Sequence, residues 1–380
     1  MSTPLMANHL KVVGSLDTLS DLLDLLLKDF RVIGPTVKDN AIIYDDIADP
    51  NDLPRGLTDE QDGGHYRLIP RSDGALFGYA VGPHSWKAQF LPSRLELWRA
   101  ETSGDTISVA AAESPNEKRA LLGVRACELR AIAIQDRVLI AGEFIDPHYK
   151  SQRDNTFIIA VNCTQAGGTC FCASMNAGPA VTGGYDLLLT ELVSESEHLF
   201  MIETGSSAGE AVVEAIRHRP ATEMEINAAR NVVAKTAADM GRKIPPVDLH
   251  DLLLSNVKSE NWTKVAERCL SCGNCTMVCP TCFCTTVDDS SDFDGKYFSR
   301  TRRWDSCFSL DFSYVHGGEV RASVASRYRQ WITHKLATWI DQFGESGCVG
   351  CGRCITWCPV GIDITEEVWA LGDQSQLAGS

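Results

Sequence analysis

The first 110 residues combine one helical pattern with several short strand-like runs. From Leu16 to Phe30 apolar residues recur at helical spacing, and acidic residues occupy the opposite face. Gly34-Pro35 is expected to end this helix. Three apolar runs bounded by Asp-Gly and Pro signals then predict strands, at Ala41–Tyr44, Tyr66–Ile69 and Ala75–Ala80. We therefore expect an α+β region over residues 1–110.

Residues 111–205 have the pattern of an α/β region. Arg119–Val124 and Phe157–Val161 are short apolar runs typical of buried strands, and Cys127–Val138 between them has helical periodicity. This order predicts a βαβ unit whose two strands are parallel. Asp186–Thr190 is expected to add a further strand.

The rest of the chain divides into a helical connector and a cysteine-rich module. Residues 206–268 have helical patterns, with Thr222 as a candidate N-cap and a break at Pro245-Pro246. Residues 269–380 contain 11 of the 15 cysteines. The predicted fold is therefore an α+β and α/β N-terminal part, a helical connector and a C-terminal two-cluster ferredoxin-like module with a long insertion between its two motifs.

The spacing C-x2-C-x2-C-x3-C-P occurs twice in this module without change. This spacing is typical of two-cluster ferredoxins, in which the fourth cysteine of each motif ligates the cluster of the other motif. It predicts two 4Fe-4S clusters with crossed ligand sets. The first cluster is assigned to Cys269, Cys272, Cys275 and Cys358, and the second to Cys348, Cys351, Cys354 and Cys279. Zinc ribbons also use C-x2-C pairs, but a run of four cysteines ending in Cys-Pro is the iron-sulfur form.

A third group of thiols is predicted to meet at the edge of the α/β region. Cys127 follows the first strand of the βαβ unit and opens its helix, and Cys163 follows the second strand. Both positions lie at the carboxyl edge of a parallel sheet, and Cys170 and Cys172 share the loop of Cys163. The helix N-terminus is expected to favour the thiolate of Cys127. Our hypothesis is a third 4Fe-4S cluster; buried structural cysteines and a zinc site are the alternatives.

Three cysteines remain outside these sets, namely Cys282, Cys284 and Cys307. The tetrapeptide Thr169–Cys172 recurs as Thr281–Cys284, which suggests related roles. With only three thiols and no evident fourth ligand, we expect them to pack around the clusters.

Composition and charge exclude several classes of protein. The net charge is −15, from 35 Lys+Arg and 50 Asp+Glu, so binding to a phosphate backbone is not expected. Apolar stretches are far shorter than the roughly 18 residues of a membrane-spanning helix, and no signal peptide of the Sec type is apparent at the N-terminus. Thiols in such a chain indicate metal ligands in the cytoplasm rather than disulfides. The chain contains no dinucleotide fingerprint or Walker sequence, so we expect an electron conductor whose catalytic chemistry occurs in other subunits.

In addition to the spacing of its cysteines, the sequence strongly resembles that of the beta subunit of NADP-linked nickel-iron hydrogenases, the sulfhydrogenases. The resemblance covers most of the chain. It rests on Cys269–Cys284, Arg302–Cys307, Arg327–Gln330, Cys348–Cys354, Cys358–Ile364, Phe77–Tyr79, Ser85–Lys87, Arg125–Cys127 and Cys170–Cys172. The chain is similar as well to the electron-relaying subunit of anaerobic sulfite reductase.

The resemblance implies a role in electron relay. Such subunits pass electrons between a flavin subunit that handles NAD(P)H and the hydrogenase small and large subunits that carry the catalytic metal. We therefore expect a cytoplasmic iron-sulfur subunit of a hydrogenase complex that binds neither nucleic acid nor membrane. The alternatives are a zinc-stabilised interaction module and a subunit of anaerobic sulfite reductase.

Overall fold

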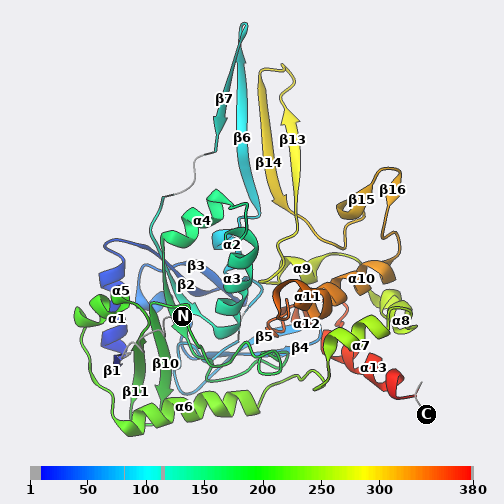
Figure 1. Cartoon of the computed structure of the whole chain (residues 1–380). Helices are drawn as coiled ribbons and strands as arrows, with labels where there is room; N and C mark the ends of the chain where they lie inside the picture. Colours follow the sequence, from blue (N-terminus) through cyan, green and yellow to red (C-terminus); the bar gives the residue numbers. More distant parts are fainter. Residues whose placement is uncertain (1–9, 81, 113–115, 378–380) are drawn as a thin grey trace, which may run out of the picture.

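The computed structural model describes residues 10–80, 82–112 and 116–377 and has a mixed α/β architecture with a cysteine-rich C-terminal module (Figure 1). Within these residues an 8-stranded sheet has the order β12-β1-β11-β10-β9-β8-β2-β3. The pairs β10·β9, β9·β8 and β8·β2 are parallel, and the outer pairs are antiparallel. The strands are β1 (Lys11–Gly14), β2 (Arg31–Lys38), β3 (Ala41–Asp46), β8 (Arg119–Val124), β9 (Thr156–Val161), β10 (Leu187–Val193), β11 (His198–Thr204) and β12 (Arg219–Pro220).

Helices cover both faces of this sheet because its central strands are apolar on both sides. In β8, Ala120 and Leu122 face a core that includes α1 and α5, whereas Leu121 faces a second core with α2, α3 and α4. The expected βαβ unit is present, with β8 and β9 parallel and α3 between them. The helices of this part are α1 (Leu16–Leu26), α2 (Lys87–Phe90), α3 (Ala126–Leu139), α4 (Pro147–Asp154), α5 (Ser207–Glu214) and α6 (Glu223–Ala238), the last capped by Thr222.

Two local expectations are wrong. The first helix ends at Leu26, and Gly34-Pro35 lies inside β2 instead of ending the helix. Parallel pairing with β8 covers only Arg31–Ile33, so the missing N–H of Pro35 interrupts no bond to that strand. Residues 75–80 form a buried loop, not a strand. Carboxylates replace strand partners there, since the N–H groups of Leu76 and Phe77 donate to Glu191.

The C-terminal module is a helical body with its own apolar core, beside the sheet domain. Helix α10 continues through a π-helical turn, η3, into α11. The helices are α7 (Leu249–Ser255), α8 (Asn261–Arg268), α9 (Asn274–Met277), α10 (Val324–Thr333), η3 (His334–Thr338), α11 (Trp339–Phe343), α12 (Arg353–Thr356) and α13 (Ile364–Leu377). No helix of the described residues is long and apolar enough to cross a membrane.

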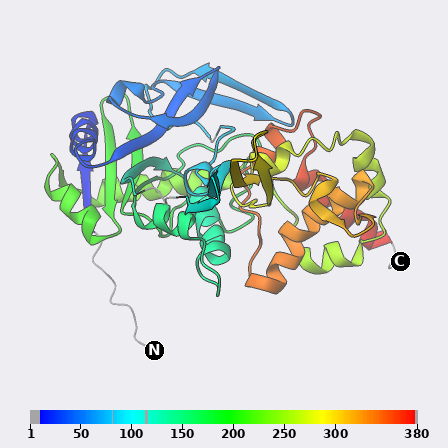
Figure 2. The same ribbon diagram turned by 90° about the horizontal axis from the view of Figure 1, so that it is seen from above.

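Two further β structures join the parts of the chain. A 4-stranded antiparallel sheet, β13-β14-β6-β7, projects from the body, and its two hairpins come from segments far apart in the sequence (Figure 1). The hairpin β4–β5 reaches from the sheet domain to the C-terminal module (Figure 2), where Gly64 N–H donates to Ile355 O over 3.1 Å. The strands are β4 (Leu57–Asp62), β5 (His65–Pro70), β6 (Arg94–Ser103), β7 (Thr106–Ala111), β13 (Thr285–Ser291) and β14 (Tyr297–Trp304). The remaining short elements are η1 (Pro50–Asp52), η2 (Asp311–Ser313), β15 (Tyr314–Val315) and β16 (Gly318–Glu319).

Candidate metal centre

The two cysteine motifs fold alike, each as a loop followed by a one-turn helix. Gly273 caps α9 with φ of 73°, and Gly352 caps α12 with φ of 77°. Both values lie in the left-handed region, where glycine is the favoured residue. The two short helices contact each other, so the motifs lie side by side in the module.

The fourth cysteine of each motif lies beside the other motif. One cavity is lined by Cys269, Cys272, Cys275 and Cys358. Burial, together with the neighbouring thiols of Cys279 and Cys351, raises the pKa of the Cys348 thiol to about 12, although Lys335 lowers it. The structure thus brings Cys358 to the first motif and Cys279 to the second, and the crossed ligand sets stay a prediction.

The donor chemistry of both motifs fits 4Fe-4S clusters. Backbone N–H groups point at ligand sulfurs, with Ser271 N 3.4 Å from Cys269 Sγ and Gly350 N 3.5 Å from Cys348 Sγ. Such N–H groups tune the reduction potential of a cluster. Burial also raises the pKa of the Cys275 and Cys354 thiols, so loading these sites with metal must displace protons.

A buried lysine lies at the second motif. The π-helical turn η3 directs Lys335 inward, where its Nζ is 3.2 Å from Cys279 Sγ and 3.0 Å from Thr281 Oγ1. Among the described residues it has no carboxylate partner. A buried cation needs compensating negative charge, and the thiolates of the second motif are the groups that can supply it.

The third group of thiols comes together against the second motif. Burial raises the pKa of the Cys170 thiol to about 12, and Cys163 beside it adds to the shift. Burial also raises the pKa of the Cys172 thiol, and the neighbouring thiols of Cys170, Cys163 and Cys351 act in the same direction. Cys127 lies in one apolar cluster with Cys172, and Cys170 Sγ is 3.9 Å from the carbonyl oxygen of Cys351. The loop after β9 and the start of α3 therefore present four thiols next to the second motif.

The position of Cys127 at the start of α3 favours its thiolate, but burial acts against this effect and raises the pKa of the thiol well above its ordinary value. The neighbouring thiols of Cys172 and Cys351 act in the same direction. Desolvation and like charges outweigh the helix dipole here, since the dipole contributes at most about 2 kcal/mol.

Arg125 places a second buried cation at this group. Its guanidinium donates to the carbonyl oxygens of Phe77, Tyr79 and Asn162 and, in the part of the chain that the structure describes, pairs with no carboxylate. Burial lowers the pKa of Arg125, but the surrounding acidic groups, of which the Cys163 thiol has the largest effect, raise it above its ordinary value. The third group, like the second motif, thus contains a cation suited to a negatively charged occupant.

Two glycines allow the third group to approach the second motif. A Cβ on Gly350 would lie 2.7 Å from the backbone of Cys172, and one on Gly352 would lie 2.5 Å from Thr169 O. Such distances exclude any side chain unless the loops separate. Phe171 N–H donates to Gly350 O over 2.8 Å, which fixes the loops at this short separation.

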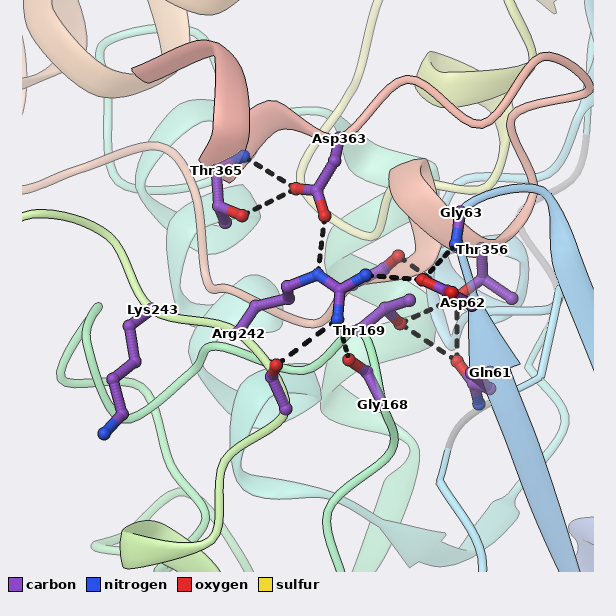
Figure 3. A network of polar contacts seen from close by, with 12 residues as sticks. Gln61, Asp62, Gly63, Gly168, Thr169, Arg242, Lys243, Thr356, Asp363 and Thr365 are labelled. Carbon is purple, nitrogen blue, oxygen red and sulfur yellow. Dashed lines mark hydrogen bonds and ion pairs between the residues drawn. The ribbon is translucent and has the colours of Figure 1, made fainter. Parts of the chain in front are cut away.

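A polar network holds the same loops to the β4–β5 hairpin (Figure 3). Thr169 Oγ1 and Thr356 Oγ1 are 2.7 Å apart, and Gln61 Oε1 accepts from both hydroxyls. Arg242 donates to Gly168 O and to the carboxylates of Asp363 and Asp62. Four segments that are distant in sequence therefore meet beside the third group and the second motif.

A buried ion pair joins α3 to the second motif. Arg353 pairs with Glu128, and each side chain is only 1% exposed. Arg353 Nε also donates to Gly82 O and His84 O, and Glu128 accepts from the backbone N–H of Trp86. The pair fixes α3, which carries Cys127, against the loop of the second motif.

Comparison with known proteins agrees with this geometry. Residues 268–362 match the family model of a 4Fe-4S dicluster domain, which supports iron-sulfur ligation rather than zinc at the two motifs. The chain is 33% identical over 258 residues to sulfhydrogenase 2 subunit beta of Pyrococcus furiosus, a match that spans 66% of this chain and 74% of the relative. The chain belongs to the family of sulfhydrogenase beta subunits. No solved structure matches it. The relation to anaerobic sulfite reductase is shown by none of these matches.

Sequence reasoning missed the cations of this family member's metal centre. Lys335 has no motif of its own, and only the π-helical turn brings it to Cys279. Arg125 had a signal, because it lies in one of the short segments that carried the family resemblance. That segment did not indicate that its cation is buried beside thiols.

Proposed function

We propose that this chain relays electrons through three 4Fe-4S clusters in a cytoplasmic hydrogenase-type complex. The first two clusters occupy the crossed ligand sets of the motifs, and the third is held by Cys127, Cys163, Cys170 and Cys172. A flavin subunit that handles NAD(P)H and the nickel-iron small and large subunits are the proposed partners. Each 4Fe-4S cluster takes up and releases one electron at a time.

One observation carries this proposal. The loop with Cys170 and Cys172 packs directly on the loop of the second motif, through the Phe171–Gly350 hydrogen bond and the close approach at Gly352. The second motif in turn contacts the first through α9 and α12. Three thiol sites thus form one continuous row, which is the arrangement that stepwise electron transfer requires.

Two buried cations and several apolar side chains surround the proposed cluster sites. Lys335 and Arg125 place positive charge at the second motif and at the third group, which favours the reduced, more negative state of each cluster. Apolar side chains such as Phe171 and Val349 keep water from these sites.

The test is a single substitution with an iron measurement. Cys163→Ala is expected to remove about four irons per chain and leave the signals of the two motif clusters unchanged. Unchanged iron content in this variant would contradict the third cluster. In the assembled complex, the variant should also slow electron transfer from NAD(P)H to the hydrogenase subunits. Cys272→Ala, in the first motif, is the matched comparison and should perturb a different cluster signal.

A further inference from the structure

The three remaining cysteines line one cavity. Cys282 and Cys284 come from the segment that follows the first motif, and Cys307 comes from the segment after β14. Their cavity has a volume of about 430 Å³ and is also lined by His334, Lys335 and aromatic side chains. This volume accommodates a cofactor, and the three thiols are the sulfur ligands that it offers.

The three thiols are in contact with the proposed electron path. Cys282 is hydrogen-bonded to Cys279, the cysteine assigned to the second cluster, and Cys284 is hydrogen-bonded to Cys307. Gln135 of α3 donates to Pro280 O over 2.8 Å and holds the start of this segment in place. The cavity therefore lies one side chain away from the second cluster site.

Two buried ammonium groups lie close enough to these thiols to interact with them electrostatically. Lys87 is 4% exposed; its Nζ is 3.2 Å from Met277 O and 4.0 Å from the ring centre of Trp304. Lys335 approaches the same thiols from η3. Neither lysine has a carboxylate partner among the residues that the structure describes. Two buried cations beside these thiols favour a negatively charged occupant, and a metal–sulfur cluster supplies such a charge.

The three thiols do not all meet around one centre, although Cys284 and Cys307 contact each other. A zinc ion draws its ligand sulfurs together around one centre, at Zn–S distances of about 2.3 Å. Within the described residues, no set of three that includes these cysteines has all ligand atoms within 4.8 Å of one another. The same is true of the eight motif cysteines, whose domain family binds 4Fe-4S clusters. A cubane spreads its thiolates over separate irons, so it fits a wider set.

The repeated tetrapeptide supports the same assignment. Thr169–Cys172 places Cys170 and Cys172 against the second motif, and Thr281–Cys284 directly follows the first motif. In each copy the phenylalanine is part of an apolar cluster: Phe171 is fully buried, and Phe283 packs against Trp339. Each copy therefore presents two thiols from one short loop.

We propose that Cys282, Cys284 and Cys307 hold a fourth 4Fe-4S cluster, whose fourth iron has no cysteine ligand and faces the cavity. The open iron accepts a small ligand from the cavity. The fourth cluster lies beside the second cluster, as a side branch of the proposed electron path. It goes beyond the three-cluster relay, because it adds an iron that exogenous molecules can reach.

The experiment compares the wild-type chain, Cys284→Ala and Cys307→Ala after anaerobic reconstitution with excess iron and sulfide. The wild type is expected to contain about sixteen irons and each variant about twelve. Ser309→Ala, two residues from Cys307, is the control and should retain the wild-type iron content. Persistence of the motif-cluster EPR signals shows that a variant has folded.

A second measurement does not depend on any variant. Ferricyanide takes one electron from a [4Fe-4S]2+ cluster with an open iron, and the resulting [4Fe-4S]3+ releases one Fe2+ to leave [3Fe-4S]+. The wild type should therefore develop the EPR signal of a 3Fe-4S cluster, and Cys284→Ala should not.

Three results would overturn the proposal: about twelve irons in the wild type with no loss in either variant, one bound zinc that both variants lose, or a Cys284–Cys307 disulfide in the reconstituted protein. The third cluster is tested separately, because Cys163→Ala reports only on the group at the sheet edge.

Discussion

The Nζ of Lys335 lies 3.2 Å from the Sγ of Cys279, inside the module and without a carboxylate partner in the described part of the chain. This contact links the π-helical turn η3 to the second motif. It makes the lysine a positioning and electrostatic residue for the second cluster.

Lys335→Met should lower the reduction potential of the second cluster. Reduction adds negative charge, which the nearby cation stabilises, so its loss should shift the potential downward by on the order of 100 mV, as for a unit charge close by in a medium of intermediate dielectric. Anaerobic redox titration followed by EPR measures this shift. Lys264→Met, at an exposed position on α8, should leave the potential unchanged. Equal potentials for Lys335→Met and the wild type would show that groups other than Lys335 compensate the negative charge of the second cluster.

Gly352→Ala should separate the Cys170 loop from the second motif. The added methyl group would meet Thr169 O at 2.5 Å, in addition to the strain of a left-handed backbone, which is about 1–2 kcal/mol. Gly344→Ala is the matched control, because its φ of 72° is nearly the same and nothing lies within 4 Å of the new Cβ. We expect Gly352→Ala to lose iron from the second motif and the third group, whereas Gly344→Ala retains it.

Breaking the Arg353–Glu128 pair should destabilise the joint between α3 and the module. Removing one partner leaves a buried charge unpaired, so Arg353→Met should lower the free energy of unfolding by about 3–5 kcal/mol. The double variant Arg353→Met/Glu128→Leu should recover much of this loss. Urea unfolding followed by circular dichroism gives both values. Arg300→Met, which removes an exposed pair with Asp289, serves as the control and should change little.

Removal of iron and sulfide should loosen the C-terminal module before the sheet domain. The ligand loops end in helices of four residues, α9 and α12, which are too short to persist unaided, whereas the 8-stranded sheet has apolar cores on both faces. In hydrogen exchange of the apoprotein, residues 268–362 should lose protection, and β8 and β9 should keep theirs. Equal loss in both regions would mean that the clusters support the whole fold.

The central fold was predictable because its signals are local. The apolar runs at Arg119–Val124 and Phe157–Val161 and the helix between them obey the βαβ rule, and they place Cys127 and Cys163 at one sheet edge. Residues 75–80 have the same apolar character but form a loop, because Glu191 and Asp59 from other elements bind their N–H groups. No local pattern reports such a distant partner.

The contact of Lys335 with the second motif was not predictable for the same reason. Cysteine spacing identifies ligands within one loop, but Lys335 is 56 residues from Cys279 and meets it only through the π-helical turn. The projecting sheet is similar: β6 and β14 pair across nearly two hundred residues, and neither strand specifies the other by its pattern.

The proposed exchange of Cys279 and Cys358 between the motifs also determines when the clusters can be inserted during synthesis of the protein. The first motif cannot complete its set until Cys358 has been synthesised, whereas the second set is complete at Cys354. Cofactor insertion therefore waits until translation has passed both positions. Until then the three early thiols of the first motif lack their fourth ligand.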